Sequence, residues 1–149
     1  MPTVYLGITG DIIHPGIINI ITEGAKYGEL VVGLLTDSAI APHKRLPYLS
    51  YEQRKVVVEN IKGVSRIVPQ EEWSYVPNLL KYRPDFIIHG DDWISGPLSK
   101  IRDEVYAVMN QLGGKVIEIP YTKGINSSAL VEQQRSEERR VGKECRSRW

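Results

Sequence analysis

Apolar residues follow two alternating patterns along most of the chain. Short, nearly continuous apolar runs lie at 3–8, 30–36, 65–68, 85–89 and 115–119, and such runs are typical of strands covered on both faces. Apolar residues at helical spacing predict helices at 15–27, 50–61, 76–82 and 98–112, with a last helix starting near residue 126. The alternation predicts an α/β fold, a doubly wound parallel sheet of five strands joined by right-handed crossovers.

Residues that favour helix ends support several of these boundaries. Ser50, followed three residues later by Gln53, has the pattern of a capping box. Pro84 disfavours right-handed helical backbone at the residue before it, so we expect the preceding helix to end there. Gly113 is typical of the residue just beyond a helix.

The last 15 residues, 135–149, break with this pattern. They have no hydrophobic period, and they match residue for residue the translation of a short-read sequencing adapter. The alternative is a natural basic tail that binds nucleic acid, and a match of this length argues against it. We therefore expect one domain at 1–134 followed by a non-native, artefactual tail at 135–149, and we leave the tail out of the fold argument.

Leaving out the tail changes the charge and the cysteine count. The whole chain has 19 Lys and Arg against 18 Asp and Glu. The tail holds six of the former and three of the latter, so residues 1–134 carry 13 against 15, a formal net charge of −2. The lone cysteine, Cys145, also lies in the tail, which leaves the domain without disulfides or thiolate metal ligands.

No apolar run reaches the roughly 18 residues of a membrane span, and no signal peptide opens the chain. We expect a cytoplasmic domain with neither a membrane nor a nucleic-acid partner. The natural protein is expected to continue beyond residue 134.

Distinctive polar residues follow four of the predicted strands, at the edge where doubly wound sheets bind ligands. His14 follows the first strand, and Pro15-Gly16 then opens a helix whose free amides and dipole favour an anion. The other groups are Asp37, Lys44 and Arg45 after the second strand, His89–Trp93 after the fourth, and Gly124–Ser128 after the fifth. Their convergence predicts phosphate chemistry on a nucleotide.

Four motifs resemble those of the cytidylyltransferase family, which includes glycerol-3-phosphate cytidylyltransferase. They are Asp11-x-x-His-Pro-Gly16, Lys44-Arg-x-Pro-Tyr-x-x-Tyr-Glu-Gln-Arg54, Gly90-Asp-Asp-Trp93 and Thr122-Lys-Gly-Ile-Asn-Ser-Ser128. The sequence of these motifs most resembles that of the nucleotidyltransferase domain that is joined to phosphoenolpyruvate phosphomutase in phosphonate biosynthesis. The resemblance implies a Rossmann-like fold of the nucleotidylyltransferase type and an enzyme that transfers CMP from CTP to a phosphate or phosphonate acceptor.

The resemblance also implies roles for individual residues. His14 and Lys44 are the implied catalytic residues, and Asp11 and Arg54 are the implied acceptor-binding residues. Nucleotide binding is implied for the Leu6-Gly7 dipeptide, Ile8, Gly16, Asp91, Trp93, Ile125, Ser127 and Ser128. Within that set, Asp91 and Trp93 are expected to recognise cytosine by hydrogen bonding and stacking. Mg²⁺ is expected to bridge the phosphates with few protein ligands, and no residue is assigned to it.

These roles fit the chemistry of the transfer. The acceptor oxygen is already anionic, so catalysis needs positioning and charge neutralisation more than a strong base. His14 would donate to phosphate oxygens, Lys44 would supply a compact cation, and the Arg54 fork would clamp the acceptor.

Other chemistry-bearing residues have structural interpretations. His43 is predicted to be solvated and His89 to be a buried strand end. Asp92 is expected to bind turn amides. Trp73 and Tyr75 are predicted to lie in the core or at the rim of the site.

The chain departs from the family pattern at one important position. The family motif has a second histidine where this chain has Ile17, which offers neither a donor nor a charge. Losing one preorganised donor typically costs about 10²–10³ in rate, so the resemblance implies a weakened enzyme at this position. Tyr121 in place of an arginine is a milder departure, and Asn126 in place of a serine is conservative.

Several alternatives stay open. The acceptor is expected to be a phosphonate such as 2-aminoethylphosphonate, with glycerol-3-phosphate as the alternative. An adenylyltransferase shares the fold and the histidine motif, but the Gly90–Trp93 motif argues against it. A catalytically silent CTP-binding domain of a fused phosphomutase is the alternative from another class. The resemblance also suggests a homodimer, which the surface pattern of this chain does not itself indicate.

Overall fold

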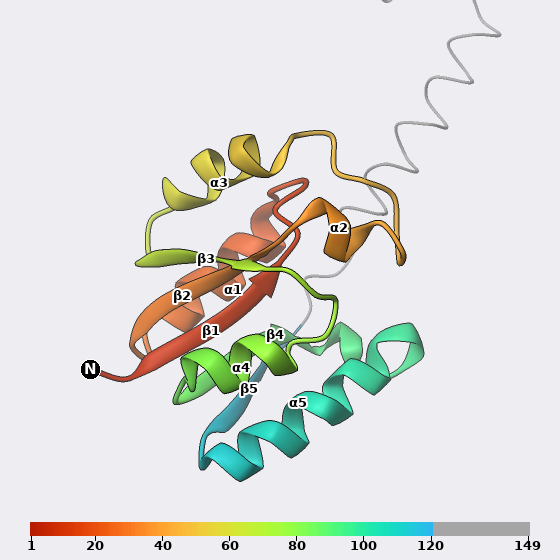
Figure 1. The fold of residues 1–149 in the computed structure, drawn as a ribbon. Coiled ribbons are helices and arrows are strands. Elements are labelled where there is room, and N and C mark those ends of the chain that lie inside the picture. The colour runs from red at the N-terminus through yellow and green to blue at the C-terminus, as the bar shows by residue number, and fades with distance from the viewer. Residues whose placement is uncertain (121–149) are drawn as a thin grey trace, which may run out of the picture.

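Five parallel strands form one sheet in the order β3-β2-β1-β4-β5 (Figure 1). The structure, a computed structural model, describes residues 1–120. The strands are β1 (Thr3–Ile8), β2 (Glu29–Leu35), β3 (Arg66–Gln70), β4 (Phe86–Gly90) and β5 (Lys115–Ile119). Every neighbouring pair runs parallel, so the predicted doubly wound sheet is confirmed.

The helices connect these strands much as the periodicity predicts. They are α1 (Pro15–Ala25), α2 (Asp37–Ile40), α3 (Tyr51–Glu59), α4 (Val76–Tyr82) and α5 (Ser99–Leu112), with 3₁₀ turns at Asp91–Trp93 and Gly96–Leu98. The short helix α2 was not predicted, because its four residues are too few to show a helical period. The helix predicted from about residue 126 and the tail at 135–149 lie outside the described residues.

Helices cover both faces of the sheet. Along β1, Val4, Leu6 and Ile8 pack on one side with Ile21 of α1, in a cluster that also includes α3. Tyr5 packs on the other side, with α4 and α5. Figure 1 shows α4 and α5 in front of the sheet and α1 behind it. Because both faces are covered, the strands are apolar throughout rather than alternating.

Helix caps form where the sequence predicts them. The Ser50 hydroxyl accepts a hydrogen bond from the amide of Gln53 at 3.2 Å, and the Gln53 side chain accepts one from the amide of Ser50 at 3.0 Å. Gly113 ends α5 in the left-handed conformation, with φ 75°. Both boundaries are confirmed, since each depends on local chemistry alone.

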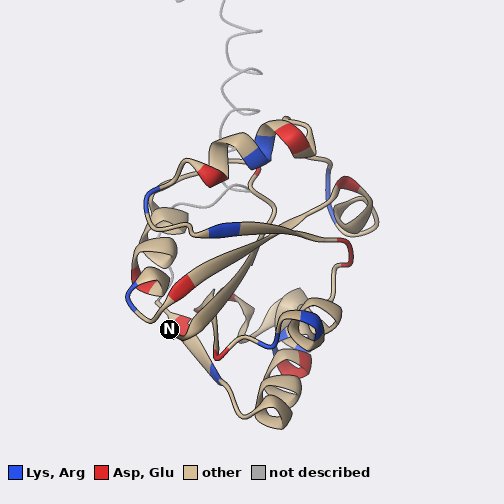
Figure 2. Cartoon of the chain, turned by 60° about the vertical axis from the view of Figure 1, so that its left-hand side comes forward, with Lys and Arg blue, Asp and Glu red and all other residues tan. Residues whose placement is uncertain are grey.

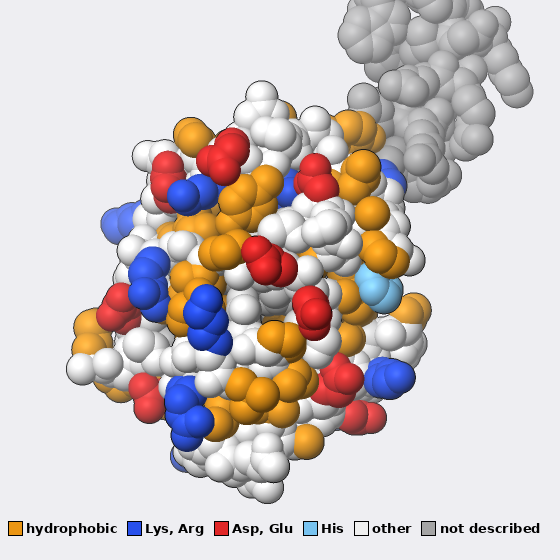
Figure 3. Space-filling model, viewed as in Figure 1, with side chains coloured by type: hydrophobic (Ala, Val, Ile, Leu, Met, Phe, Trp, Pro, Cys, Tyr) orange, Lys and Arg blue, Asp and Glu red, His pale blue; other side chains and the backbone are white. Residues whose placement is uncertain are grey.

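Charged residues lie mainly on helices, loops and strand ends, as Figure 2 shows. On the face drawn in Figure 3, charged side chains of both signs separate the apolar side chains into smaller groups. Within residues 1–120, no helix has the length and apolar character needed to cross a membrane.

Candidate active site

A pocket of about 540 Å³ lies at the carboxyl ends of β1 and β4. The tip of β1 and the first turn of α1 line one part of it, and Lys44 lines another. Trp73, Tyr75 and the segment that follows β4 complete the lining. The strand order reverses between β1 and β4, so the pocket lies where doubly wound folds bind ligands.

His14 caps α1 and lines the pocket. Its Nδ1 accepts a hydrogen bond from the amide of Gly16 at 3.1 Å, so Nδ1 carries no proton. Burial lowers the pKa of the His14 imidazole from its ordinary value, which favours the neutral ring. The proton of that neutral ring is then on Nε2. His14 therefore offers an N–H donor at the N-terminus of α1.

The first turn of α1 adds an apolar wall beside this donor. Pro15 takes the first helical position, as predicted, and Gly16 is buried. Ile17 and Ile20 line the pocket. The position of the family's second histidine therefore lines the pocket, and in this chain the aliphatic Ile17 occupies it.

Lys44 lines the pocket from the turn that follows α2. The amides of His43 and Lys44 both donate to the carbonyl of Ile40, at 2.9 and 3.1 Å. Ile40 is fully buried, so this turn is anchored in the core. Burial lowers the pKa of the Lys44 ammonium, while the negative charge of Asp11 acts in the opposite direction.

An aromatic contact supports the same turn. The rings of His43 and Trp73 stack with centroids 4.4 Å apart and an angle of 14° between their planes. Trp73 also packs on the buried cluster that contains Ile40. His43 is exposed, as predicted, and its contact with Trp73, which joins two segments 30 residues apart in the sequence, was not predicted.

Asp11 joins two loops. Its carboxylate pairs with Arg45 at 2.5 Å and accepts a hydrogen bond from the amide of Tyr48 at 3.2 Å. The Arg45 guanidinium lies 4.5 Å from the centre of the Tyr48 ring. Only 4% of the Asp11 side chain is exposed, and Asp11 does not line the pocket. The structure thus gives Asp11 a different role from the predicted acceptor contact.

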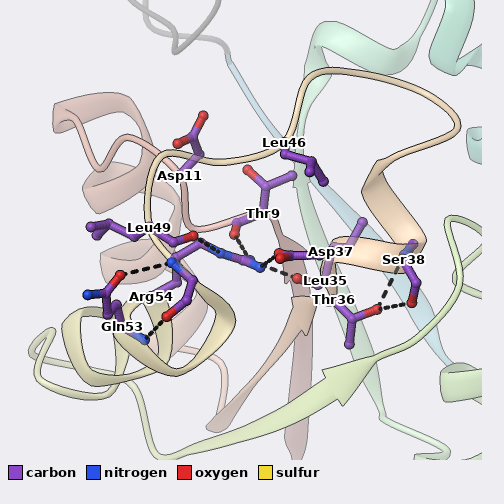
Figure 4. Close-up of polar contacts among 12 residues, drawn as sticks. Thr9, Asp11, Leu35, Thr36, Asp37, Ser38, Leu46, Leu49, Gln53 and Arg54 are labelled. Carbon is purple, nitrogen blue, oxygen red and sulfur yellow. Dashed lines mark hydrogen bonds and ion pairs between the residues drawn. The ribbon is translucent and has the colours of Figure 1, made fainter.

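Arg54 is fully buried beneath these loops (Figure 4). Its Nε donates to the carbonyl of Leu49 at 3.3 Å. One terminal nitrogen donates to the carbonyls of Thr9 and Leu35, at 2.5 and 2.7 Å. The other donates to the Asp37 carboxylate at 2.7 Å. Arg54 therefore binds the protein's own loops, and in this arrangement it is buried and does not line the pocket, so its predicted contact with the acceptor stays a prediction.

Two stacked rings form the wall on the β4 side. His89 and Trp93 lie parallel, with centroids 3.8 Å apart and planes 1° apart. His89 Nδ1 lies 2.7 Å from the carbonyl oxygen of Gly90, and burial lowers the pKa of its imidazole. Trp93 is fully buried, and its Nε1 donates to Glu118 at 2.6 Å. The predicted stacking of Trp93 on cytosine does not fit this ring, since His89 covers one face and none of it is exposed.

The tip of β1 requires glycine because Tyr75 lies against it. The Tyr75 hydroxyl donates to the carbonyl of Gly7 at 3.0 Å. A Cβ on Gly7 would lie 2.8 Å from the Tyr75 ring, which is closer than van der Waals contact allows. Tyr75, which was predicted to lie in the core or at the rim, is buried and also lines the pocket.

The pocket brings together most of the described residues predicted for the site. Those that line it are Leu6, Gly7, Ile8, His14, Gly16, Lys44 and Trp93. Asp11, Arg54 and Asp91 do not line it, although Asp92 does. The predicted residues Ile125, Ser127 and Ser128 lie outside the described residues, as do the departures at 121 and 126.

His89 lies near the end of β4 with 14% of its side chain exposed, as the predicted buried strand end, but its place in the pocket wall was not predicted. Its signal was present, since it directly precedes the Gly90–Trp93 motif at the end of a buried strand. A histidine on a strand that is otherwise apolar requires a polar neighbour or a ligand. Within residues 1–120, no group of three His, Cys, Asp or Glu side chains is arranged to hold a metal ion.

Known proteins are similar to most of this chain. A family model described as Cytidylyltransferase-like matches residues 7–133. Glycerol-3-phosphate cytidylyltransferase of Bacillus subtilis (strain 168) is 28% identical over 127 residues, which cover 84% of this chain and 91% of that protein. Ethanolamine-phosphate cytidylyltransferase of Mus musculus is 32% identical over 123 residues, which cover 81% of this chain and 30% of that protein.

A solved structure extends the similarity to three dimensions. The lipopolysaccharide core biosynthesis protein from Thermoplasma volcanium GSS1 is 26% identical to this chain, with a TM-score of 0.70. The match covers 83% of this chain and 99% of that one. The two chains therefore share the same overall fold.

Proposed function

The chain belongs to the cytidylyltransferase-like family, and from this premise we propose that it transfers CMP from CTP to a small acceptor bearing a phosphate or phosphonate. An anionic acceptor oxygen attacks the α-phosphorus of CTP and forms a new P–O bond. The bond to the β-phosphate oxygen breaks, and pyrophosphate leaves with the electron pair. The observation that carries the proposal is the neutral His14, which offers an N–H donor at a helix N-terminus inside the pocket.

His14 stabilises the charge that builds up on the departing pyrophosphate. Its Nε2–H donates to a phosphate oxygen, and the amides of the first turn of α1 favour the same anion. Because the acceptor oxygen is already negative, no side chain has to remove a proton from it. Removing one preorganised donor of this kind typically costs about 10²–10³ in rate.

Lys44 neutralises phosphate charge from the turn that follows α2. Its ammonium is a compact cation with three donors, suited to phosphate or phosphonate oxygens. Hydrogen bonds to Ile40 anchor the backbone that carries this cation at the pocket, which favours positioning of the reacting groups.

The remaining nucleotide contacts follow the family motifs. We propose that the nucleotide lies beside the backbone of Leu6, Gly7, Ile8 and Gly16. We also propose nucleotide contacts for Asp91, Ile125, Ser127 and Ser128. A Mg²⁺ ion bound to the triphosphate would supply neutralisation of phosphate charge. We assign no protein ligand to it.

The acceptor that we propose is a phosphonate such as 2-aminoethylphosphonate. This compound carries an amine two carbons from phosphorus, and phosphoethanolamine, the acceptor in the name of one relative, differs by a bridging oxygen. Glycerol-3-phosphate is the second candidate, because it appears in the name of another relative. A fused phosphomutase and a homodimer remain parts of the proposal.

A silent CTP-binding domain is the second candidate function. Ile17 favours it, since the pocket position of a second imidazole is apolar. His14 and Lys44 favour turnover, since both line the pocket.

Pyrophosphate release tests the proposal. The full chain is incubated with Mg²⁺ and one nucleotide (CTP, UTP or ATP), with 2-aminoethylphosphonate, phosphoethanolamine, glycerol-3-phosphate or no acceptor. We expect release that depends on both CTP and one acceptor, and loss of release in His14→Ala. The control is Lys26→Ala, because Lys26 is exposed and paired only with Glu23 among the described residues.

Three other outcomes decide between the candidates. Tight CTP binding without release with any acceptor favours the silent domain. Release that depends on ATP would replace the cytidylyl assignment with an adenylyl one. Release that is undiminished in His14→Ala contradicts the assigned role of His14.

A further inference from the structure

We propose that Glu118 is a positioning residue of the pocket. Its carboxylate holds Trp93, and through Trp93 it holds the His89 ring in the orientation that forms the wall on the β4 side. Glu118 lies outside the family motifs. The test of its role by CTP binding rests on the function proposed above.

Glu118 accepts four hydrogen bonds. Its Oε2 accepts from Trp93 Nε1 at 2.6 Å and from Arg102 Nε at 2.9 Å. Its Oε1 accepts from a terminal nitrogen of Arg102 at 3.2 Å and from the Tyr106 hydroxyl at 2.7 Å. An ionised carboxylate has about four acceptor positions, so this one is saturated. The Arg102 pair is also bidentate, which fixes the plane of the carboxylate.

The indole of Trp93 depends on this carboxylate. Trp93 has no exposed area, and Glu118 is the partner of its Nε1 among residues 1–120. An indole N–H buried without an acceptor loses its bond to water and gains nothing in return. The hydrogen bond therefore fixes the rotation of the indole as well as its depth.

The position of His89 depends in turn on the indole. The two rings lie 3.8 Å apart and parallel within 1°, so a rotated indole cannot keep this contact. His89 and Glu118 are also partners across the β4–β5 pairing, which places both side chains on the same face of the sheet. Strand pairing thus brings the carboxylate to the edge of the stack.

Glu118 acts on the pocket only through these rings. His89 and Trp93 line the pocket, together with Ile101 of α5, whereas Glu118 does not. Arg102 and Tyr106 come from the outer side of α5, and Tyr106 is 38% exposed. The contact between Glu118 and Tyr106 is therefore a matched control, because it shares the carboxylate but does not touch the stack.

The indole N–H resonances report on the first step of the proposal. The full chain has three tryptophans, and Trp93→Phe assigns the signal of Trp93. We expect Glu118→Leu to shift that signal and to speed its hydrogen exchange at least about tenfold, the size of one lost buried hydrogen bond. Tyr106→Phe should leave the signal in place. Glu118→Gln keeps a carbonyl acceptor and should retain most of the protection, so it is the conservative rescue and replaces Glu118→Leu if the latter does not fold.

CTP binding reports on the second step. We expect Glu118→Leu to weaken the affinity for CTP about tenfold, and Tyr106→Phe to stay within about twofold of the unchanged protein. An undisturbed Trp93 signal in Glu118→Leu, or an equal disturbance in Tyr106→Phe, would overturn the proposal. If the unchanged chain does not bind CTP, the proposed function fails, and the resonance measurement alone then decides the role of Glu118.

Discussion

The two sides of the pocket are held in place by different forces. On the side of β1 and β2, buried charges join loops: Arg54 binds three carbonyls and Asp37, and Asp11 binds Arg45. On the side of β4, stacked rings form the wall, and one carboxylate fixes them from behind. The first side presents groups suited to phosphate, and the second presents flat, largely buried surface.

The difference shows that a residue in a family motif need not touch a ligand. Asp11 and Arg54 belong to the motifs, yet the structure uses both to hold the loops that carry His14 and Lys44. A charged group that is buried and paired is costly to remove, so such residues serve the site by holding its loops in place. On the β4 side, Glu118, a residue outside the motifs, holds the ring stack in place through Trp93.

Removing Arg54, which holds the loops on the β1 and β2 side of the pocket, should have the largest effect on stability. Arg54→Met leaves three carbonyls and the Asp37 carboxylate without their shared donor, so we expect a loss of about 3–5 kcal/mol in the free energy of unfolding. Urea unfolding followed by circular dichroism measures it. The control is the neighbouring Lys55→Met, which should stay within about 0.5 kcal/mol. A loss no larger than that of the control would mean that Arg54 is not holding the loops.

Adding the second imidazole at position 17, on the β1 and β2 side of the pocket, should raise the rate of catalysis. Ile17→His places a donor beside His14 in the pocket, and we expect kcat to rise by about 10²-fold. Pyrophosphate release at saturating CTP measures it. The control is Ile18→His, one position further along α1, where the side chain is 36% exposed and does not line the pocket. Equal rates in the unchanged chain and Ile17→His would show that His14 and the helix N-terminus suffice.

Acid should weaken the β4 side through Glu118. Its hydrogen bonds from Arg102 are the main cause that lowers the pKa of Glu118 from 4.5 to about 2. A lowered folded-state pKa stabilises the fold above pH 4.5, and this stability is lost as the pH falls from 4.5 towards 2. We expect Tm to fall more steeply across this window in the unchanged chain than in Glu118→Gln, by a small amount because the pair is partly exposed.

The comparison variant for this pH series is Glu59→Gln, at the exposed end of α3. Its Tm should fall with decreasing pH as steeply as that of the unchanged chain. Parallel curves for Glu118→Gln and the unchanged chain would contradict the assigned role of the Arg102 contacts.

Loosening the turn that carries Lys44 should have the smallest effect. His43→Ala removes the stack on Trp73, and we expect the KM for the acceptor to rise about threefold to tenfold with little change in kcat. His43→Phe keeps a flat ring and should restore the KM. Steady-state kinetics with varied acceptor measure both variants, and an unchanged KM in His43→Ala would show that the Ile40 hydrogen bonds alone anchor the turn.

Local signals made most of the fold predictable. Apolar runs located all five strands, and helical spacing with the Ser50 and Gly113 caps located four helices. The helix α2 was missed because four residues show no period, and it is held by the Thr36 cap and by burial of Ile40. That omission mattered for the site, since α2 is what carries Lys44 to the pocket.

The sequence by itself determined the sheet, the edge at which the site lies, and the placement of His14 at a helix N-terminus. Each of these follows from neighbours along the chain, through apolar periodicity, capping and motif spacing. Only the tertiary structure decided that Asp11 and Arg54 hold loops, that Trp93 is covered by His89, and that Glu118 fixes that pair. Apart from the His89–Trp93 stack, whose rings are four residues apart, these roles depend on partners 17 to 45 residues away. Strand pairing and burial bring these partners together, and a linear pattern carries no record of which buried polar group meets which.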